Sequence, residues 1–508
     1  MNDRTFQTST TLADETATAH LMADLALLVR PGNVITLSGE LGAGKTAAAR
    51  ALIRHLAGDP ALEAPSPTFT LAQSYELDAF PVLHADLYRV NDPTELEELG
   101  LAPLPEDALV LLEWPERAPQ ALPEDRIDIH FSQQSALGPT SRFAVITGFG
   151  AAAAAVERLE LLRRFLAAAG YSDAERQHMA GDASTRSYAR LVRDGTPEIL
   201  MNFPPRVDRH LIYNGKSYLE VAHLADELKP FVAIGQELHR RGFSVPAIHH
   251  TDLDTGFLIC EDLGADGVVE GMPPAPLLDR YQTSIDVLVT LHQQQLPTTL
   301  KVAGGSDYAM PSFDVAAMLV EVGLLLDWYL PDRGVPVDAT MRTEFDALWR
   351  DLLAPVLQAP ATWVLRDFHS PNLIWRAARA GIAKVGIIDF QDAVLGPSAY
   401  DVVSLAQDAR VDIPEAVEIA LLSRYVQGRR SKDPDFDASG FAATYAIVSA
   451  QRNTRLLGVF SRLNRRDGKP HYLRHQPRIW RYLSRSLTHP ALATIAAWYK
   501  AHLQPPSA

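Results

Sequence analysis

The stretch Gly39-Glu40-Leu41-Gly42-Ala43-Gly44-Lys45-Thr46 decides the fold of the first part of this 508-residue chain. An apolar β-type run at residues 33–38 precedes it, and a helical pattern at residues 46–56 follows it. Glycines in the loop let the backbone wrap a phosphate chain, while the helix N-terminus and Lys45 supply positive potential. The pattern therefore predicts a P-loop, with Thr46 placed to ligate Mg²⁺. A flexible glycine loop without a ligand is the alternative.

The residues after the P-loop predict a small α/β domain. Runs rich in apolar and β-branched residues recur with turn signals between them, which is typical of strands. These runs are residues 70–75, 80–86, 108–113, 126–131 and 142–147. The first domain is expected to span residues 1–150.

Three further segments carry polar side chains suited to a nucleotide site. They are Ser66-Pro67-Thr68-Phe69, His84-Ala85-Asp86-Leu87-Tyr88-Arg89 and Leu111-Leu112-Glu113-Trp114-Pro115. A carboxylate that ends a buried strand beside a P-loop is suited to hold Mg²⁺ directly or through water, so Glu113 is the metal and catalytic candidate. Taken alone, Asp86 could be a turn or capping residue, and Trp114 could simply pack.

Together these segments resemble the TsaE family, the bacterial ATPases required to make threonylcarbamoyladenosine in tRNA. The resemblance spans roughly residues 5–148. It implies that residues Gly39 to Thr46 bind ATP, that Thr46 and Glu113 hold Mg²⁺, and that Asp86 and Thr68 lie near the nucleotide as switch-like elements. It also implies a complex with TsaD/TsaB-type proteins, which act on the tRNA.

Charge is distributed unevenly along the chain. Residues 1–150 contain 9 Lys plus Arg against 21 Asp plus Glu, which is −12 of the total net charge of −15. Nonspecific affinity for nucleic acid comes from neutralising phosphates with Lys and Arg. We therefore expect the first domain not to bind tRNA strongly on its own, so that a partner protein must hold the tRNA.

A second set of residues, more than three hundred positions further on, predicts a different phosphate chemistry. It consists of Leu365-Arg366-Asp367-Phe368-His369-Ser370-Pro371-Asn372 and Ile387-Ile388-Asp389-Phe390-Gln391-Asp392. Phosphoryl transfer to a hydroxyl needs a carboxylate beside the incoming oxygen and oxygen ligands for Mg²⁺. Asp367 fits the catalytic role, and Asn372 with Asp389 fits the metal role.

Other polar residues near this set have competing interpretations. His369 could orient the loop, but a buried, hydrogen-bonded histidine is favoured. Asp392 and Asp401 could extend the metal shell or cap helices, and for Asp401 the structural role is favoured.

The second set resembles the aminoglycoside-phosphotransferase-like kinases, and within them the AmgK group, anomeric kinases of N-acetylmuramate and N-acetylglucosamine in cell-wall recycling. Asp327-Trp328-Tyr329 and Gln451-Arg452-Asn453 add to the resemblance, which covers roughly residues 156–490. It implies ATP, Mg²⁺ and an amino-sugar substrate.

Two segments are expected to bind the nucleotide of this kinase. Gly181-Asp182-Ala183-Ser184-Thr185-Arg186-Ser187-Tyr188 could close over phosphates through backbone N–H groups, with Ser184 and Arg186 as binding residues, although an ordinary hairpin turn is equally compatible. Glu261-Asp262-Leu263-Gly264 follows a strand where a kinase would present Glu261 and Leu263 backbone groups to adenine.

One position departs from the kinase pattern. The strand Glu198-Ile199-Leu200-Met201-Asn202 offers Asn202 where a phosphate-binding Lys is expected. Arg186, Arg206 or Arg209 could substitute, or ATP binding could be weaker.

The chain as a whole is expected to be an α/β P-loop domain followed by an α+β, bilobal kinase-like domain at residues 151–508. Its small lobe is placed at about 156–265 and its helical lobe at about 266–495. The single cysteine, Cys260, fits a reducing compartment, and no signal segment or apolar run of membrane-spanning length occurs, so a cytoplasmic location is expected.

These observations indicate a bifunctional protein with an ATPase half and an amino-sugar kinase half. Two other interpretations stay open. The P-loop domain could be an interaction switch that regulates a small-molecule kinase, or the kinase domain could be a degenerate scaffold for a TsaE ATPase.

Overall fold

The computed structural model describes residues 4–90, 95–98, 101–179, 186–205, 211–213, 215–302 and 305–503. The chain forms two compact units. The first comprises Met1–Pro204 with His249–Asp262, and the second comprises Pro205–Ile248 with Leu263–Ala508. The predicted boundary between the P-loop domain and the kinase-like domain, near residue 150, stays a prediction.

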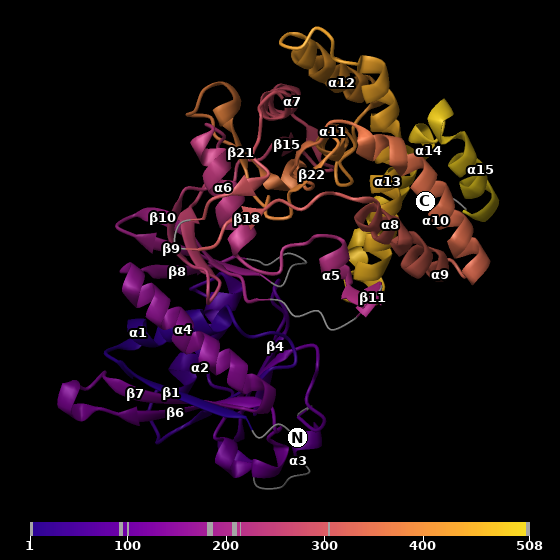
Figure 1. Cartoon of the computed structure of the whole chain (residues 1–508). Coiled ribbons are helices and arrows are strands. Elements are labelled where there is room, and N and C mark those ends of the chain that lie inside the picture. The colour runs from indigo at the N-terminus through magenta and orange to yellow at the C-terminus, as the bar shows by residue number, and fades with distance from the viewer. Residues whose placement is uncertain are drawn as a thin grey trace. The chain divides into compact units, whose positions relative to one another are not determined.

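The first unit contains a seven-stranded sheet in the order β1-β7-β6-β2-β5-β4-β3. Strands β6, β2, β5 and β4 are parallel, whereas β1, β7 and β3 add antiparallel edges. Figure 1 shows β1, β6 and β7 running side by side. The strands are β1 (Thr5–Leu12), β2 (Val34–Ser38), β3 (Ala72–Tyr75), β4 (Val82–Asp86), β5 (Leu109–Glu113), β6 (Arg126–Gln133) and β7 (Arg142–Phe149). The predicted α/β fold is confirmed.

Helices α1 (Glu15–Ala26) and α2 (Lys45–Ala57) form a buried hydrophobic core together with this sheet. Helix α2 agrees with the predicted helix at 46–56, and its N-cap is Gly44 in the left-handed conformation. Strand β1 was missing from the sequence prediction because its pattern, TFQTSTTL, is mostly polar. It forms at the sheet edge because it pairs with β7, although its own sequence contains few apolar residues.

The first unit also contains a five-stranded sheet in the order β13-β14-β10-β9-β8. Helix α4 (Ala153–Ala169) joins the two sheets in sequence, and its Leu162 and Leu166 share a buried cluster with Leu200 of β10 and with Leu27, which follows α1. The strands are β8 (Glu175–His178), β9 (Ser187–Arg193), β10 (Thr196–Asn202), β13 (Ile248–Asp252) and β14 (Phe257–Glu261).

A buried ion pair crosses the same region. Arg176 of β8 donates through Nε to Oδ1 of Asp24 in α1 at 3.0 Å, and both side chains are almost completely buried. The P-loop sheet and the five-stranded sheet therefore belong to one compact unit, in which α1 and α4 connect their two buried clusters.

The second unit is mainly helical, as expected for the larger lobe of a kinase-like fold. Helix α6 starts at Lys229, because Pro230 fits the first turn of a helix and has no N–H to donate within one. The helices are α5 (Tyr218–Val221), α6 (Lys229–Arg240), α7 (Leu278–His292), α8 (Val315–Leu324), α9 (Leu330–Asp332), α10 (Ala339–Gln358), α11 (Ala399–Ala406), α12 (Glu415–Arg430), α13 (Ala438–Arg465), α14 (Gln476–Ser486) and α15 (Ala493–His502).

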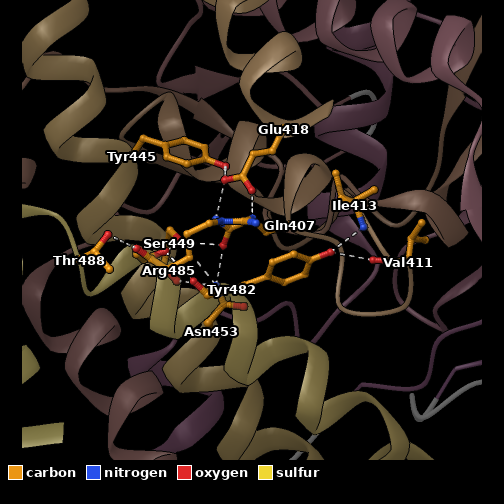
Figure 2. A network of polar contacts seen from close by, with 11 residues as sticks. Gln407, Val411, Ile413, Glu418, Tyr445, Ser449, Asn453, Tyr482, Arg485 and Thr488 are labelled. Atoms are coloured by element: carbon orange, nitrogen blue, oxygen red, sulfur yellow. Dashed lines mark hydrogen bonds and ion pairs between the residues drawn. The ribbon is translucent and has the colours of Figure 1, made fainter. Parts of the chain in front are cut away.

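A buried polar network ties helices α12, α13 and α14 together (Figure 2). Glu418 of α12 accepts hydrogen bonds from Gln407 and Tyr445, both at 2.8 Å, and from Arg485. Asn453 of α13 donates to Oε1 of Gln407 at 2.7 Å. A cavity of about 390 Å³ opens beside Glu418. Because the carboxylate of Glu418 already accepts three hydrogen bonds, we assign the network a structural role: it holds α13 in position against α12 and α14.

Candidate functional sites

The P-loop joins β2 to α2 in a conformation that requires glycine. Gly39 has a φ of 132°, and a Cβ there would lie 2.2 Å from the carbonyl oxygen of Phe131. Arg142, from β7, donates through Nε to the carbonyl of Ala43 at 3.0 Å and so fixes the loop from outside. Sequence reasoning missed Arg142, because it lies about a hundred residues from the loop.

Lys45 lies against the loop that it serves. Its Nζ donates to the carbonyls of Gly39 at 2.7 Å and Glu40 at 2.9 Å, and lies 3.6 Å from the ring centroid of Trp114. Burial lowers the pKa of Lys45, although the nearby carboxylate of Glu113 opposes that effect. The ammonium group is therefore held at the loop by carbonyl and ring contacts that phosphate oxygens could replace.

Glu113 and Thr46 meet as the sequence predicts. Oγ1 of Thr46 donates to Oε2 of Glu113 at 2.9 Å, and Oε1 of Glu113 lies 2.9 Å from Nε2 of the fully buried His84. The hydroxyl hydrogen of Thr46 is thus committed to the carboxylate, which leaves its oxygen lone pairs for a cation. Hard oxygen donors of this kind fit Mg²⁺, which also keeps water and phosphate ligands.

Asp86 lies next to Glu113 because β4 and β5 are parallel and pair these two residues in register. Its Oδ2 accepts hydrogen bonds from the hydroxyls of Ser66 and Thr68, both at 2.9 Å. Its Oδ1 accepts from the backbone N–H of Tyr88, which is a capping role. The capping interpretation of Asp86 is therefore observed, while its role beside the nucleotide stays a prediction. The three predicted segments converge at the ends of β4 and β5.

The second candidate site lies in the helical unit, on the loop between β19 (Thr362–Val364) and β20 (Leu373–Trp375). Two buried carboxylates hold this loop. Asp401 accepts from the backbone N–H groups of Leu365 at 2.7 Å and Arg366 at 2.9 Å. Asp408 accepts from the backbone N–H of Ser370 at 2.8 Å and from its hydroxyl at 2.6 Å. Asp401 therefore has the structural role that was favoured.

The predicted metal ligands lie together in this unit. Nδ2 of Asn372 donates to the carbonyl of Asp367 at 3.0 Å and lies 3.4 Å from Oδ2 of Asp389. Gln391 donates to Oδ1 of Asp389 at 3.0 Å and orients that carboxylate. Asp392 instead accepts from the backbone N–H of Ala225, which is an anchoring contact. The amide and carboxylate oxygens of Asn372 and Asp389 fit Mg²⁺.

Asp367 is held in its ionised form. Burial alone would raise its pKa, but His369, Arg455, Arg452 and Arg366 together lower the pKa to about 2. Burial and Arg410 lower the pKa of His369 to about 4, so this ring is neutral at pH 7. Nε2 of His369 lies 3.2 Å from Nη1 of Arg410, and its Nδ1 lies 3.8 Å from Oδ1 of Asp367. Because Arg410 donates to Nε2, the ring hydrogen is on Nδ1, on the side of Asp367.

The residues expected to bind the kinase nucleotide are only partly described. Ser184 lies outside the described residues, as do Arg206 and Arg209. The guanidinium of Arg186 lies 5.5 Å from the ring centroid of Phe203. Glu261 ends β14 opposite Glu198, whereas Leu263 belongs to the second unit and packs against Gly386. Their nucleotide-binding roles stay predictions.

Asn202, at the position expected for Lys, forms hydrogen bonds within the sheet region and so has a structural role. Its Oδ1 accepts from Nε of Arg158 at 2.7 Å, and its Nδ2 donates to the hydroxyl of Ser187 at 2.9 Å. It lies on the same face of β10 as Leu200, which packs against α4. Arg158 comes from α4 and could not be found from the sequence, because it lies 44 residues away.

Two features do not occur in the described part of the chain. None of its helices is long and apolar enough to cross a membrane. Nor does any group of three or more His, Cys, Asp or Glu side chains there form a metal cluster. Sites that share Mg²⁺ between two protein ligands, water and phosphate need no such cluster.

Comparison with known proteins divides the chain in the same order as its motifs. Residues 12–141 match the family described as threonylcarbamoyl adenosine biosynthesis protein TsaE, and residues 177–438 match the phosphotransferase enzyme family. An N-acetylmuramate/N-acetylglucosamine kinase of Caulobacter vibrioides is 35% identical over 68% of this chain and 96% of its own length. The corresponding kinase of Pseudomonas aeruginosa is 29% identical over 62% of this chain and 85% of its own length.

The N-terminal part has its own relatives. A tRNA threonylcarbamoyladenosine biosynthesis protein TsaE of Rickettsia bellii is 36% identical over 24% of this chain and 83% of its own length. The chain therefore belongs to two families, the TsaE family through its P-loop region and the phosphotransferase enzyme family through the rest.

Proposed function

We propose that this chain is a bifunctional enzyme. Its N-terminal part is an ATPase required for threonylcarbamoyladenosine modification of tRNA. Its C-terminal part is an ATP-dependent anomeric kinase of N-acetylmuramate or N-acetylglucosamine in cell-wall recycling. The observation that carries the proposal is the presence of two separate oxygen-donor pairs. Thr46 with Glu113 lies at the P-loop, and Asn372 with Asp389 lies beside Asp367.

The proposal includes cofactors, partners and location. ATP with Mg²⁺ serves both halves, and bound Mg²⁺ would neutralise charge on the transferring phosphates. TsaD/TsaB-type proteins are the proposed partners of the acidic N-terminal part, and the cytoplasm is the proposed location. The relatives named for these activities support this assignment.

In the ATPase half, the chain's residues position phosphate groups. The backbone of Gly39 to Gly44 and the ammonium of Lys45 bind the phosphates, and the hydroxyl of Thr46 is oriented by Glu113. His84 contacts the other oxygen of Glu113 and so fixes the orientation of this carboxylate. Ser66 and Thr68 position Asp86 beside it.

In the kinase half, Asp367 accepts the hydrogen bond of the anomeric hydroxyl. As the hydroxyl oxygen bonds to the γ-phosphorus, the bond from that phosphorus to the β–γ bridging oxygen breaks, and its electron pair leaves with ADP. The hydroxyl proton passes to Asp367. A carboxylate with a pKa near 2 is a weak base, but it suffices for an acidic anomeric hydroxyl when proton transfer is late.

A direct test is incubation of the full-length protein with ATP, Mg²⁺ and each amino sugar, followed by phosphorus NMR. We expect a sugar 1-phosphate. Stimulation of ATP hydrolysis by TsaD/TsaB-type proteins tests the other half. Sugar phosphate without such stimulation would reject the ATPase proposal alone, and stimulation without sugar phosphate would reject the kinase proposal alone.

A further inference from the structure

His369, on the loop between β19 and β20, has one ring nitrogen with a partner and one without. Nη1 of Arg410 lies 3.2 Å from Nε2 of the ring. Nδ1 is buried and has no hydrogen-bond partner among the described residues. Because a guanidinium group only donates hydrogen bonds, Nε2 accepts and the ring hydrogen is on Nδ1. The loop therefore contains a buried N–H donor that the protein itself leaves unpaired.

The orientation of this ring is fixed by contacts on both of its sides. Asp408 accepts the backbone N–H groups of Ser370 and Arg410, both at 2.8 Å. Ser370 directly follows His369, and the backbone N–H of His369 donates to the carbonyl of Asp367 at 3.0 Å. One buried carboxylate thus holds both the loop and the arginine that contacts Nε2. The direction of the Nδ1–H group is set by the fold.

The unpaired Nδ1 lies close to the carboxylate that is proposed to meet the acceptor. Its distance to Oδ1 of Asp367 is 3.8 Å. That is too long for a direct hydrogen bond, which spans about 2.7–3.2 Å, but it is less than the sum of two such bonds. One oxygen atom can therefore bond to both groups at once. The side chain of Asp367 is 27% exposed and that of His369 is 9% exposed, so a ligand can reach this oxygen position from the side of Asp367.

A hydroxyl group matches these two neighbours. It has one hydrogen to donate and two lone pairs with which to accept. A hydroxyl that donates to Asp367 and accepts from His369 keeps one lone pair free, and that pair can form the bond to the γ-phosphorus. A carboxylate would be repelled by Asp367, and an ammonium group has no lone pair to accept from Nδ1–H. The pair of residues therefore selects a neutral hydroxyl.

We propose that His369 is a second catalytic residue of the kinase half, whose Nδ1–H donates to the acceptor hydroxyl oxygen while Asp367 accepts the hydrogen of the same hydroxyl. This inference rests on the proposed kinase function. As the oxygen bonds to the γ-phosphorus, its proton passes to Asp367, and the electron pair of the broken P–O bond leaves with ADP. His369 keeps its own proton and stabilises negative charge that develops on the acceptor oxygen. This help is needed because the carboxylate of Asp367 is a weak base.

The test compares two replacements of His369 in the full-length protein. His369→Leu removes the donor, so kcat for sugar phosphorylation should fall by about a hundredfold, as when one donor to a reacting oxygen is lost. The KM for ATP should stay within about twofold, because the ring acts on the acceptor. His369→Asn places an amide N–H near the position of Nδ1 and should bring kcat back to within about tenfold of the unmodified chain.

The matched control is His292→Asn. His292 is a buried histidine of the same unit, and its Nδ1 lies 2.8 Å from the hydroxyl of Tyr425. Because this ring lies outside the catalytic loop, kcat of the control should stay within about threefold of the unmodified chain.

Other outcomes overturn the inference. A rise in the KM for ATP as large as the fall in kcat, without recovery in His369→Asn, would show that the ring only supports the loop. An unchanged kcat in His369→Leu would show that water, and not the acceptor, lies beside Nδ1. Either result, with sugar phosphate formed by the unmodified chain, rejects the inference alone. No sugar phosphate from the unmodified chain rejects the kinase function, and the inference with it.

A measurement on the unmodified chain covers the case in which His369→Leu does not fold. In protein whose histidine rings carry the heavy nitrogen isotope, the NMR signal that is absent from His369→Asn identifies Nδ1 of His369. Saturation with the sugar that the chain phosphorylates, with ADP in place of ATP, should shift this signal, because a new hydrogen bond forms there. A signal that does not move, or a ring hydrogen found on Nε2, overturns the inference.

Discussion

The two catalytic regions are built by different means. In the P-loop region, the functional groups lie at the ends of neighbouring parallel strands, so the register of β4 with β5 brings Asp86 beside Glu113. In the kinase region, Asp367 lies on an irregular loop that is held by Asp401 and Asp408, more than thirty residues away. One site is produced by regular strand pairing, and the other by buried side-chain contacts with α11 and the segment that follows it.

This difference leads first to a prediction for the kinase loop. Asp367→Asn should lower kcat for sugar phosphorylation by about a thousandfold, because the amide cannot accept the hydroxyl proton. The KM for ATP should change little, since Asp367 acts on the acceptor. Steady-state kinetics with varied ATP and sugar measures both values. An equally large rise in the KM for ATP would place Asp367 at the nucleotide instead.

The corresponding change in the P-loop region is Glu113→Ala. It should lower ATP hydrolysis by the N-terminal part by at least about a hundredfold, because Thr46 loses its orienting carboxylate. Sugar phosphorylation should persist, since Glu113 lies in the other site. Hydrolysis is measured in the presence of TsaD/TsaB-type proteins, and 1-phosphate is measured in their absence. Loss of both activities in a folded variant would contradict two independent sites.

The same contrast explains what sequence could predict. The P-loop, its flanking strand and helix, Glu113 and Asp86 follow from local patterns and from the parallel order of strands. The supports of the second site do not. Asp401 and Asp408 act by accepting backbone N–H groups of a loop that lies more than thirty residues away in the sequence. The edge strand β1 was missed because its residues are mostly polar and it forms by pairing with β7.

The first unit offers a third prediction, on stability, because a buried ion pair links α1 to β8 of the five-stranded sheet. Asp24→Ala should lower the free energy of unfolding of this unit by about 3 kcal/mol, since it leaves the buried guanidinium of Arg176 without its carboxylate. Glu157→Ala is the control, because its pair with Arg4 is exposed and should contribute less than about 1 kcal/mol. Chemical denaturation of both variants measures the difference. Equal effects would show that the Asp24 pair is not buried in solution.

The smallest expected effect of a single substitution is on the response of the helical unit to pH. Burial is the largest cause that lowers the pKa of His292 to about 3 and that of His369 to about 4, against a usual value of 6.5. Between these values and 6.5 the unfolded chain binds more protons than the folded chain, so stability falls as pH falls. From pH 7 to 5 each ring should cost about 2 kcal/mol.

The helical unit should therefore be less stable at pH 5 than at pH 7, and His292→Gln should make this dependence shallower. His292 is the better test position, because its Nδ1 contacts the hydroxyl of Tyr425 at 2.8 Å and lies outside the catalytic loop. Urea denaturation at pH 5, 6 and 7 provides the measurement. The same slope in His292→Gln and in the unmodified chain would show that His292 is protonated in the folded unit, which its burial beside Tyr425 and the charge of Arg429 oppose.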